Sequence, residues 1–92
     1  MSSHPVKYLL CYDIKNPRRL RRVHRLVRDW GLPVQFSVFE IELMPPQLEK
    51  LLIELAELIE VSEDKVMFYR LSSNQERIGL GSHQVTNDVF FI

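Results

Sequence analysis

The chain has 92 residues and a mass of 10.9 kDa, which suffices for one compact domain over residues 1–92. Hydrophobic residues make up 46% and charged residues 26%, and twelve basic residues balance twelve acidic ones, so composition excludes disordered, collagen-like and coiled-coil chains. The single cysteine, Cys11, excludes an internal disulfide and a cysteine-cluster zinc site. The apolar runs are too short to span a bilayer and the N-terminus lacks a signal-peptide pattern, so we expect a cytoplasmic protein without a membrane partner.

Residues 6–14 are almost continuously apolar and aromatic, which predicts a strand covered on both faces and ending at Asp13. Asn16 and Pro17 then predict a helix start, as N-cap and first helical residue. Gly31 predicts the end of this helix. Between these signals, apolar residues recur at helical spacing and form one stripe: Leu20, Val23, Val27 and Trp30.

Residues 33–44 predict strand structure with a change of phase in the middle. Apolar residues alternate in one phase up to Val38 and in the other from Phe39 onward, which predicts a bulge or a sharp bend and hence two short strands or one kinked strand. Ser37 lies at this switch, where its hydroxyl either bonds the bulge or serves chemistry. Pro45 and Pro46 then open a second helix, whose apolar face consists of Leu48, Leu51, Leu52, Leu55, Leu58 and Ile59.

A further strand is predicted over residues 65–71, a polar connector over 72–84 and a C-terminal strand over 85–92. The element order predicts an α+β, ferredoxin-like βαββαβ sandwich with its core in residues 6–71 and both helices on one face of the sheet. The other face must then be covered. The two-sided apolar strand over 6–14 and the apolar C-terminal segment predict that a second copy covers it, as a homodimer.

The zero net charge is an average over two opposed blocks. Seven of the twelve basic residues lie within 15–28, and eight of the twelve acidic residues lie within 40–64. Only Asp29 stands on the basic segment to neutralise it. The block is either a solvated helix face or a phosphate-binding surface, because arginine fits phosphate oxygens bidentately. In the second case the candidate nucleic-acid-binding residues are Arg18, Arg19, Arg21, Arg22 and Arg25.

Asp13 is the strongest candidate for a catalytic or metal-binding residue. A carboxylate at the end of a buried strand, just before a helix, stands where sheets often carry their sites, although it can also serve as a cap. Mg²⁺ takes one or two protein carboxylates and keeps several waters, so a two-fold dimer with Asp13 near its axis would supply both from one position. His4, His24 and His83 lack metal-ligand spacing and are expected at the surface or in the tails, while Cys11 is expected in the core.

Several motifs together resemble one family. The run Tyr12-Asp13-Ile14, the arginine-rich helix and above all the hexapeptide Gln35-Phe36-Ser37-Val38-Phe39-Glu40 resemble the small CRISPR-associated endoribonuclease of the spacer-acquisition machinery. The downstream runs within 63–71 and 76–79 agree, so that the resemblance extends from about Lys7 to the C-terminus.

The resemblance implies a ferredoxin-like homodimer whose C-terminal strands pack across the subunit interface. It implies Mg²⁺, or Mn²⁺, held between the two copies of Asp13, with hydrolysis of phosphodiester bonds in single-stranded RNA or duplex DNA. It also implies partnership with CRISPR integrase dimers. Tyr12, Arg22 and Phe39 correspond to residues that the family places around its active site.

Two further basic positions of the family fall on Leu20 and Pro33, and Arg19 and Arg21 stand beside the first. A non-catalytic, DNA-binding scaffold in the spacer-integration complex therefore stays open as the alternative to a nuclease. An RNA-recognition module on the same fold is disfavoured, because residues 65–71 lack its aromatic-glycine signature.

Overall fold

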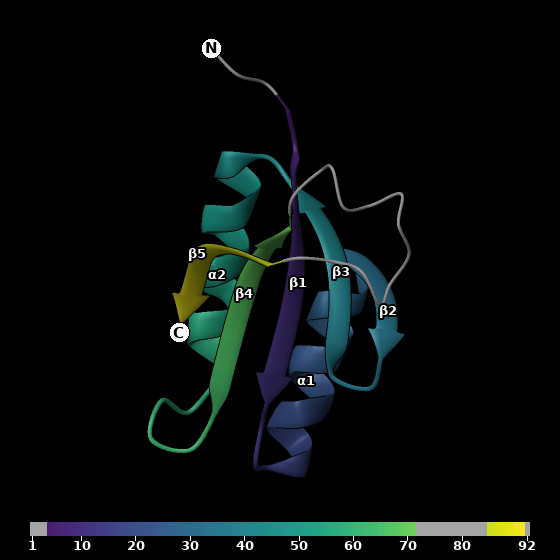
Figure 1. Cartoon of the computed structure of the whole chain (residues 1–92). Coiled ribbons are helices and arrows are strands. Elements are labelled where there is room, and N and C mark those ends of the chain that lie inside the picture. The colour runs from purple at the N-terminus through teal and green to yellow at the C-terminus, as the bar shows by residue number, and fades with distance from the viewer. Residues whose placement is uncertain (1–3, 72–84, 92) are drawn as a thin grey trace.

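The computed structural model describes residues 4–71 and, as backbone, residues 85–91. In chain order the elements are β1 (Val6–Asp13), α1 (Pro17–Arg28), β2 (Gly31–Gln35), β3 (Val38–Leu43), α2 (Pro45–Leu58), β4 (Lys65–Leu71) and β5 (Val85–Phe91) (Figure 1). The expected strands and helices are thereby confirmed to within a few residues at their ends. The expected connector over 72–84 lies outside the described residues.

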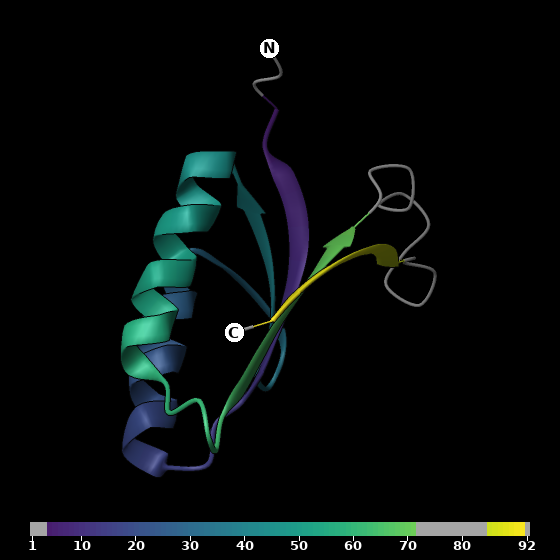
Figure 2. The ribbon, with the colours of Figure 1, turned by 90° about the vertical axis from the view of Figure 1, so that its left-hand side faces the viewer.

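The strands form one antiparallel sheet in the order β2-β3-β1-β4-β5. Both helices lie side by side on one face of this sheet (Figure 2). The first four strands and the two helices are the predicted ferredoxin-like sandwich, and β5 adds a strand beside β4 of the same chain. In the described part of the chain, neither helix is long and apolar enough to cross a membrane.

The core lies between the sheet and the helices. On β1, for example, Tyr8, Leu10 and Tyr12 are buried, whereas the residues that alternate with them are more exposed. This alternation follows from the period of two in a strand, which sends successive side chains to opposite faces. The other buried core residues are Ile14, Val23, Val27, Phe39, Ile41, Leu43, Leu51, Leu55, Ile59, Val66 and Phe68.

Helix α1 begins as its sequence predicts. The Asn16 side-chain Oδ1 accepts hydrogen bonds from the backbone N–H groups of Arg18 and Arg19, at 2.9 and 3.1 Å, and Pro17 occupies the first turn. The cap of α1 is therefore Asn16 and not Asp13, which the sequence also allowed. The Asp13 carboxylate is left for other contacts.

The expected role of Gly31 as the helix stop is wrong. Helix α1 ends at Arg28 with Asp29 as its C-cap, and Gly31 is the first residue of β2, opposite Ile41. A Cβ at Gly31 would lie 2.6 Å from the carbonyl oxygen of Glu40 and would also overlap the Ile41 side chain. Glycine is therefore needed for the close approach of two strands rather than for a change of helix direction.

The predicted phase switch is a hairpin turn. Phe36 and Ser37 connect β2 to β3, and Ser37 adopts a left-handed backbone conformation with φ of 66°. Of the two predicted alternatives, the structure has the two short strands, and the register between them shifts between Pro33 and Gln35. Phe36, in phase with the apolar residues of the first strand, stands at the turn with its side chain 80% exposed.

The sheet face opposite the helices carries a row of half-buried side chains. Cys11 of β1 lies between Val38 of β3 and Met67 of β4, and in the next row Leu9 pairs with Tyr69. The Tyr69 hydroxyl donates a hydrogen bond to the Met67 sulfur at 3.2 Å. We call this surface the open face. Burial there raises the pKa of the Cys11 thiol, which fits its expected role as a packing residue.

Candidate active site and basic groove

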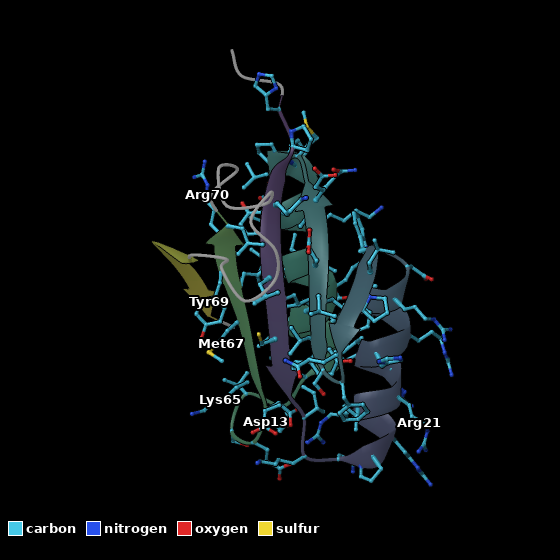
Figure 3. All side chains as sticks on the ribbon, turned by 45° about the vertical axis from the view of Figure 1, so that its right-hand side comes forward. Asp13, Arg21, Lys65, Met67, Tyr69 and Arg70 are labelled. Atoms are coloured by element: carbon cyan, nitrogen blue, oxygen red, sulfur yellow. The ribbon has the colours of Figure 1, made fainter. Side chains whose placement is uncertain are left out.

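Asp13 is the last residue of β1, on the same side of the sheet as the open face. It is exposed and lies directly opposite Lys65 in the pairing of β1 with β4 (Figure 3). The Lys15 ammonium Nζ lies 3.3 Å from the Asp13 Oδ2. The carboxylate is thus accessible and already attracts a cation, and both side chains of this ion pair are more than half exposed.

Tyr12, although adjacent in sequence, points to the other side of the sheet. Its hydroxyl lies 2.9 Å from Nδ1 of His24, and its ring stacks on Phe39 with the centroids 6.3 Å apart. Burial raises the pKa of Tyr12, and a hydrogen bond with Ser37 opposes that effect. Tyr12 and Phe39 are both buried, so the structure does not bring them together with the Asp13 carboxylate.

His24, which the sequence placed at the surface, is half-buried at the edge of this cluster. Its ring packs edge-on against Phe39 with the centroids 5.4 Å apart, in addition to its contact with the Tyr12 hydroxyl. The spacing of Leu20, Val23 and Val27 places His24 at the border of the apolar stripe, which is the signal that could have located it. Among the other expected surface histidines, His83 lies outside the described residues.

The hairpin turn is fastened to the end of β1. The backbone N–H of Tyr12 donates a hydrogen bond to the carbonyl oxygen of Ser37 at 3.1 Å. Phe36 directly precedes Ser37, so this hydrogen bond fixes the turn that carries Phe36 against the end of β1.

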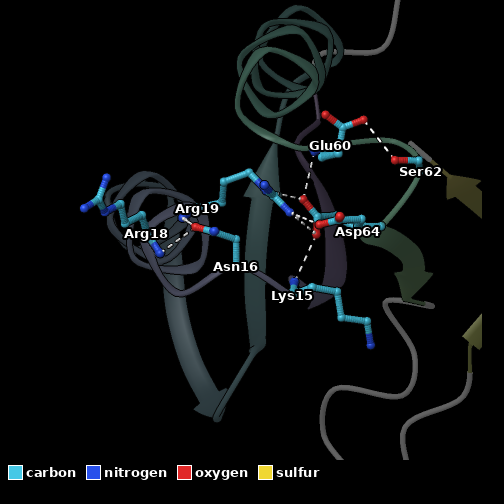
Figure 4. A network of polar contacts seen from close by, with 8 residues as sticks. Lys15, Asn16, Arg18, Arg19, Glu60, Ser62 and Asp64 are labelled. Atoms are coloured by element: carbon cyan, nitrogen blue, oxygen red, sulfur yellow. Dashed lines mark hydrogen bonds and ion pairs between the residues drawn. The ribbon is translucent and has the colours of Figure 1, made fainter.

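Arg19 is a structural residue rather than a free member of the basic block. Its Nε lies 2.8 Å from Oδ2 of Asp64, and its Nη2 lies 2.7 Å from Oε1 of Glu63 (Figure 4). The neutralising acids come from the loop after α2, more than forty residues along the chain, and not from Asp29 on the same segment. This contact ties the start of α1 to the start of β4.

Asp64 is the buried centre of this network, and sequence reasoning missed it. Its carboxylate also accepts the backbone N–H groups of Lys15 at 3.0 Å and of Glu60 at 2.8 Å. Burial raises the pKa of Asp64, but the hydrogen bonds from Arg19 and from the two backbone N–H groups outweigh it, and the pKa falls to about 2. The bond to Lys15 fixes the loop that follows Asp13.

The other candidate arginines, Arg18, Arg21, Arg22 and Arg25, are exposed on α1. Part of this surface borders a hollow of about 320 Å³ between α1 and the hairpin turn, which we call the basic groove. It is lined by Leu20, Arg21, His24, Arg25, Arg28 and Phe36. Arg21 and Asp13 lie toward the same end of the molecule (Figure 3).

A divalent cation at Asp13 has to be judged from the donors that the chain provides. Within residues 4–71, no three His, Cys, Asp or Glu side chains gather into a metal-binding group. Asp13 offers one accessible carboxylate at the end of β1, and carboxylate oxygen is the ligand type that Mg²⁺ and Mn²⁺ accept. The residue fits a divalent ion, and a paired site requires the same carboxylate from a second copy.

Comparison with known proteins gives a consistent result. The family described as "CRISPR associated protein Cas2" matches residues 6–78. A "CRISPR-associated endoribonuclease Cas2 2" from Thermodesulfovibrio yellowstonii is 39% identical over 67 residues, which are 73% of this chain and 74% of that protein. A "CRISPR-associated endoribonuclease Cas2 4" from Rhodospirillum rubrum is 35% identical over 63 residues, 68% of this chain, and the match covers only about half of that protein, 51%.

Among solved structures, the crystal structure of Streptococcus pyogenes Cas2 superposes with a TM-score of 0.73 at 33% sequence identity. The match covers 80% of this chain and 95% of that one. The sequence and the structure comparisons therefore agree on the same family and the same fold.

Proposed function

This chain belongs to the CRISPR-associated Cas2 family, and on that premise we propose that it is a metal-dependent endoribonuclease of CRISPR adaptation with Asp13 as its metal-binding carboxylate. The observation that carries the proposal is the position of Asp13: exposed, at the end of the central strand β1 and at the border of the open face. The names of the relatives support the reaction class, since both are described as endoribonucleases. We place the protein in the cytoplasm, with the nucleic acid on which it acts.

The active form in this proposal is a homodimer joined through the open face. Leu9, Cys11, Met67 and Tyr69 are half-buried in the single chain, so a second copy would remove further apolar surface from water. Asp13 stands at the end of the same face, so the two-fold axis would bring two carboxylates toward one another. The site is incomplete without the partner copy, because one chain contributes a single carboxylate.

In this proposal, the exposed side chains bind the cation and the substrate, and the buried ones position the site. Asp13 holds the cation, and the exposed Arg22 binds phosphate oxygens and stabilises the negative charge that develops during hydrolysis. A divalent cation held there supplies activation of water and polarisation of a phosphoryl oxygen. Tyr12 and Phe39 act from beneath: being buried, they hold β1 and the hairpin turn and do not touch the substrate.

Phosphate binding extends along α1. Arg18, Arg21 and Arg25 are exposed on the same helix as Arg22 and add sequence-independent contacts to the nucleic acid. Arg19, which the sequence placed in this set, instead holds Asp64 and Glu63. Its contribution to binding is therefore indirect, through the position of the first turn of α1.

The test is a cleavage assay on labelled single-stranded RNA and duplex DNA with Mg²⁺, with Mn²⁺ and with a chelator. Asp13→Asn should reduce the cleavage rate by at least about a hundredfold, since it removes the charge that holds the cation. Asp29→Asn, the same substitution at the exposed C-cap residue of α1, should cut like the wild type. Urea unfolding must show that both variants fold, and sedimentation must give twice the 10.9 kDa chain mass. An Asp13→Asn variant that cuts at the wild-type rate contradicts the proposal.

A second function is favoured by the exposure of Arg18, Arg22 and Arg25 on α1, which can hold phosphates without the Asp13 carboxylate. In this case the dimer is a non-catalytic scaffold that binds duplex DNA and bridges CRISPR integrase dimers. Spacer acquisition would then survive Asp13→Asn and fail when Arg18, Arg22 and Arg25 are replaced together by Gln. Loss of acquisition on Asp13→Asn, with folding and dimerisation intact, would instead assign the role in acquisition to the metal site.

A further inference from the structure

Phe36 is an unusual feature of the basic groove. A large aromatic side chain that is 80% exposed keeps apolar area in water, and the hairpin turn offers it no cover within the described residues. The turn itself is well fixed, because the carbonyl oxygen of Ser37 accepts the Tyr12 N–H and the neighbouring strands are paired. Phe36 is thus a ring presented to solvent from a rigid support.

The opposite wall of the groove is cationic. Arg21, Arg25 and Arg28 follow one another at intervals of four and three residues, so that they share one face of α1. Unlike Arg19, none of these three forms an ion pair with a carboxylate among residues 4–71. Their charge is available to a ligand, and we call them the groove arginines.

An aromatic ring beside unpaired arginines is the combination that binds single-stranded nucleic acids. The ring stacks on a base and the cations hold the phosphates that flank it. A base inside a duplex is already stacked on its neighbours and does not offer its face. The volume of about 320 Å³ falls in the range of small-ligand sites, large enough for one base.

We propose that the basic groove binds one unpaired nucleotide of a single-stranded nucleic acid, with the base stacked on Phe36 and the flanking phosphates on the groove arginines. This site is distinct from the metal carboxylate at Asp13, and its occupation requires no divalent cation. The proposal therefore stands or falls independently of the cleavage reaction.

The test measures binding without catalysis. Fluorescence anisotropy in EDTA would follow labelled oligo(U), labelled oligo(dT) and a labelled DNA duplex of the same length. Phe36→Ala should weaken binding of the tighter single strand about 5- to 100-fold and leave the duplex within about twofold. Phe36→Tyr, which keeps the ring, should bind like the wild type. Leu32→Ala removes a similarly exposed apolar side chain (74%, against 80% for Phe36) from β2 and is the matched control.

The groove arginines have a separate readout. Binding of a single strand should weaken with salt, and Arg25→Gln should lower the slope of log K against log salt by about 0.7, the value of one phosphate contact. An oligonucleotide carrying 5-iodouracil should cross-link to Phe36, as mapped by mass spectrometry of the wild-type protein.

Four outcomes would overturn the proposal. Phe36→Ala could weaken single strand and duplex equally, which would leave only phosphate contacts. The cross-link could map elsewhere, or polyglutamate could compete as well as the oligonucleotide, which would indicate an acidic peptide ligand. Finally, Phe36→Ala could halve the sedimenting mass, which would make Phe36 a subunit contact.

Discussion

Replacing Asp64 by Asn tests how much the buried network between α1 and β4 contributes to stability. In the wild type, Oδ2 accepts Nε of Arg19 and the Glu60 N–H, both at 2.8 Å, while Oδ1 accepts Nη2 of Arg19 and the Lys15 N–H. An asparagine amide has the same shape but only one oxygen. Whichever way it is turned, two N–H donors face an NH₂ group, and the Arg19 guanidinium loses its counter-charge.

Breaking a buried ion pair by removing one partner costs about 3–5 kcal/mol. The Arg19 side chain is 21% exposed and can turn partly to water, so we expect the lower end, a loss of about 3 kcal/mol. That is a large part of the roughly 5–15 kcal/mol by which such domains are stable. The midpoint of thermal unfolding should fall by about 10–20 °C.

The pH dependence of the unfolding free energy is a second test of the same network. The pKa of Asp64 falls from its ordinary 3.8 to about 2 on folding, so the group contributes stability above pH 3.8 and loses it as the pH falls through 2. The contribution is about 2 kcal/mol. The difference between wild type and Asp64→Asn should therefore shrink on acidification from pH 5 to pH 2.

The assay is urea unfolding followed by the fluorescence of Trp30, the single tryptophan, at one fixed protein concentration. Glu63→Gln is the matched control, because it removes the exposed partner of the second Arg19 ion pair and should cost less than about 1 kcal/mol. Equal stability of Asp64→Asn and Glu63→Gln, or a difference that does not change between pH 5 and pH 2, would refute the reasoning.

Two further substitutions test local features by the same urea assay. Gly31→Ala should destabilise the protein by about 1–3 kcal/mol, because the new methyl group meets the backbone of Glu40, and a cost below 0.5 kcal/mol would show that β2 yields freely. Asn16→Ala should cost about 1 kcal/mol by removing the acceptor for the first N–H groups of α1, whereas Asn16→Asp keeps that acceptor and should match the wild type; equal losses in both would contradict the capping role.

The local signals in the sequence predicted the elements well, because local physics decides them. Asn16 and Pro17 start a helix wherever they precede an apolar stripe, and the phase change around Ser37 could be accommodated only by a turn or a bulge. The ferredoxin-like fold then followed from the order of these elements, which contains two β-α-β crossovers. The prediction for Gly31 was wrong because a glycine soon after a helix can either end that helix or begin the next strand. The sequence does not distinguish these two roles, and only the pairing of Gly31 with β3 does.

The candidate site was less predictable, because its contacts are long-range. Nothing near Arg19 indicates that Asp64 lies beside it, since the two meet only when α1 and the loop before β4 pack at one end of the sheet. By contrast, the separation of Tyr12 from Asp13 was available in advance: neighbours in a strand point to opposite faces. The exposure of Phe36 required the turn geometry, which a phase change alone does not specify.

The neighbouring helices give this neutral molecule an electric dipole. Exposed arginines lie along α1, and exposed Glu49 and Glu57 lie on α2 beside it in the same layer. With a formal net charge of zero, a distant uniform field exerts no pull on such a body but does exert a torque. Near a polyanion, the protein therefore rotates until α1 faces the polyanion and α2 faces away from it. Orientation of approach is thus built into the helical layer, and it requires no excess of positive charge.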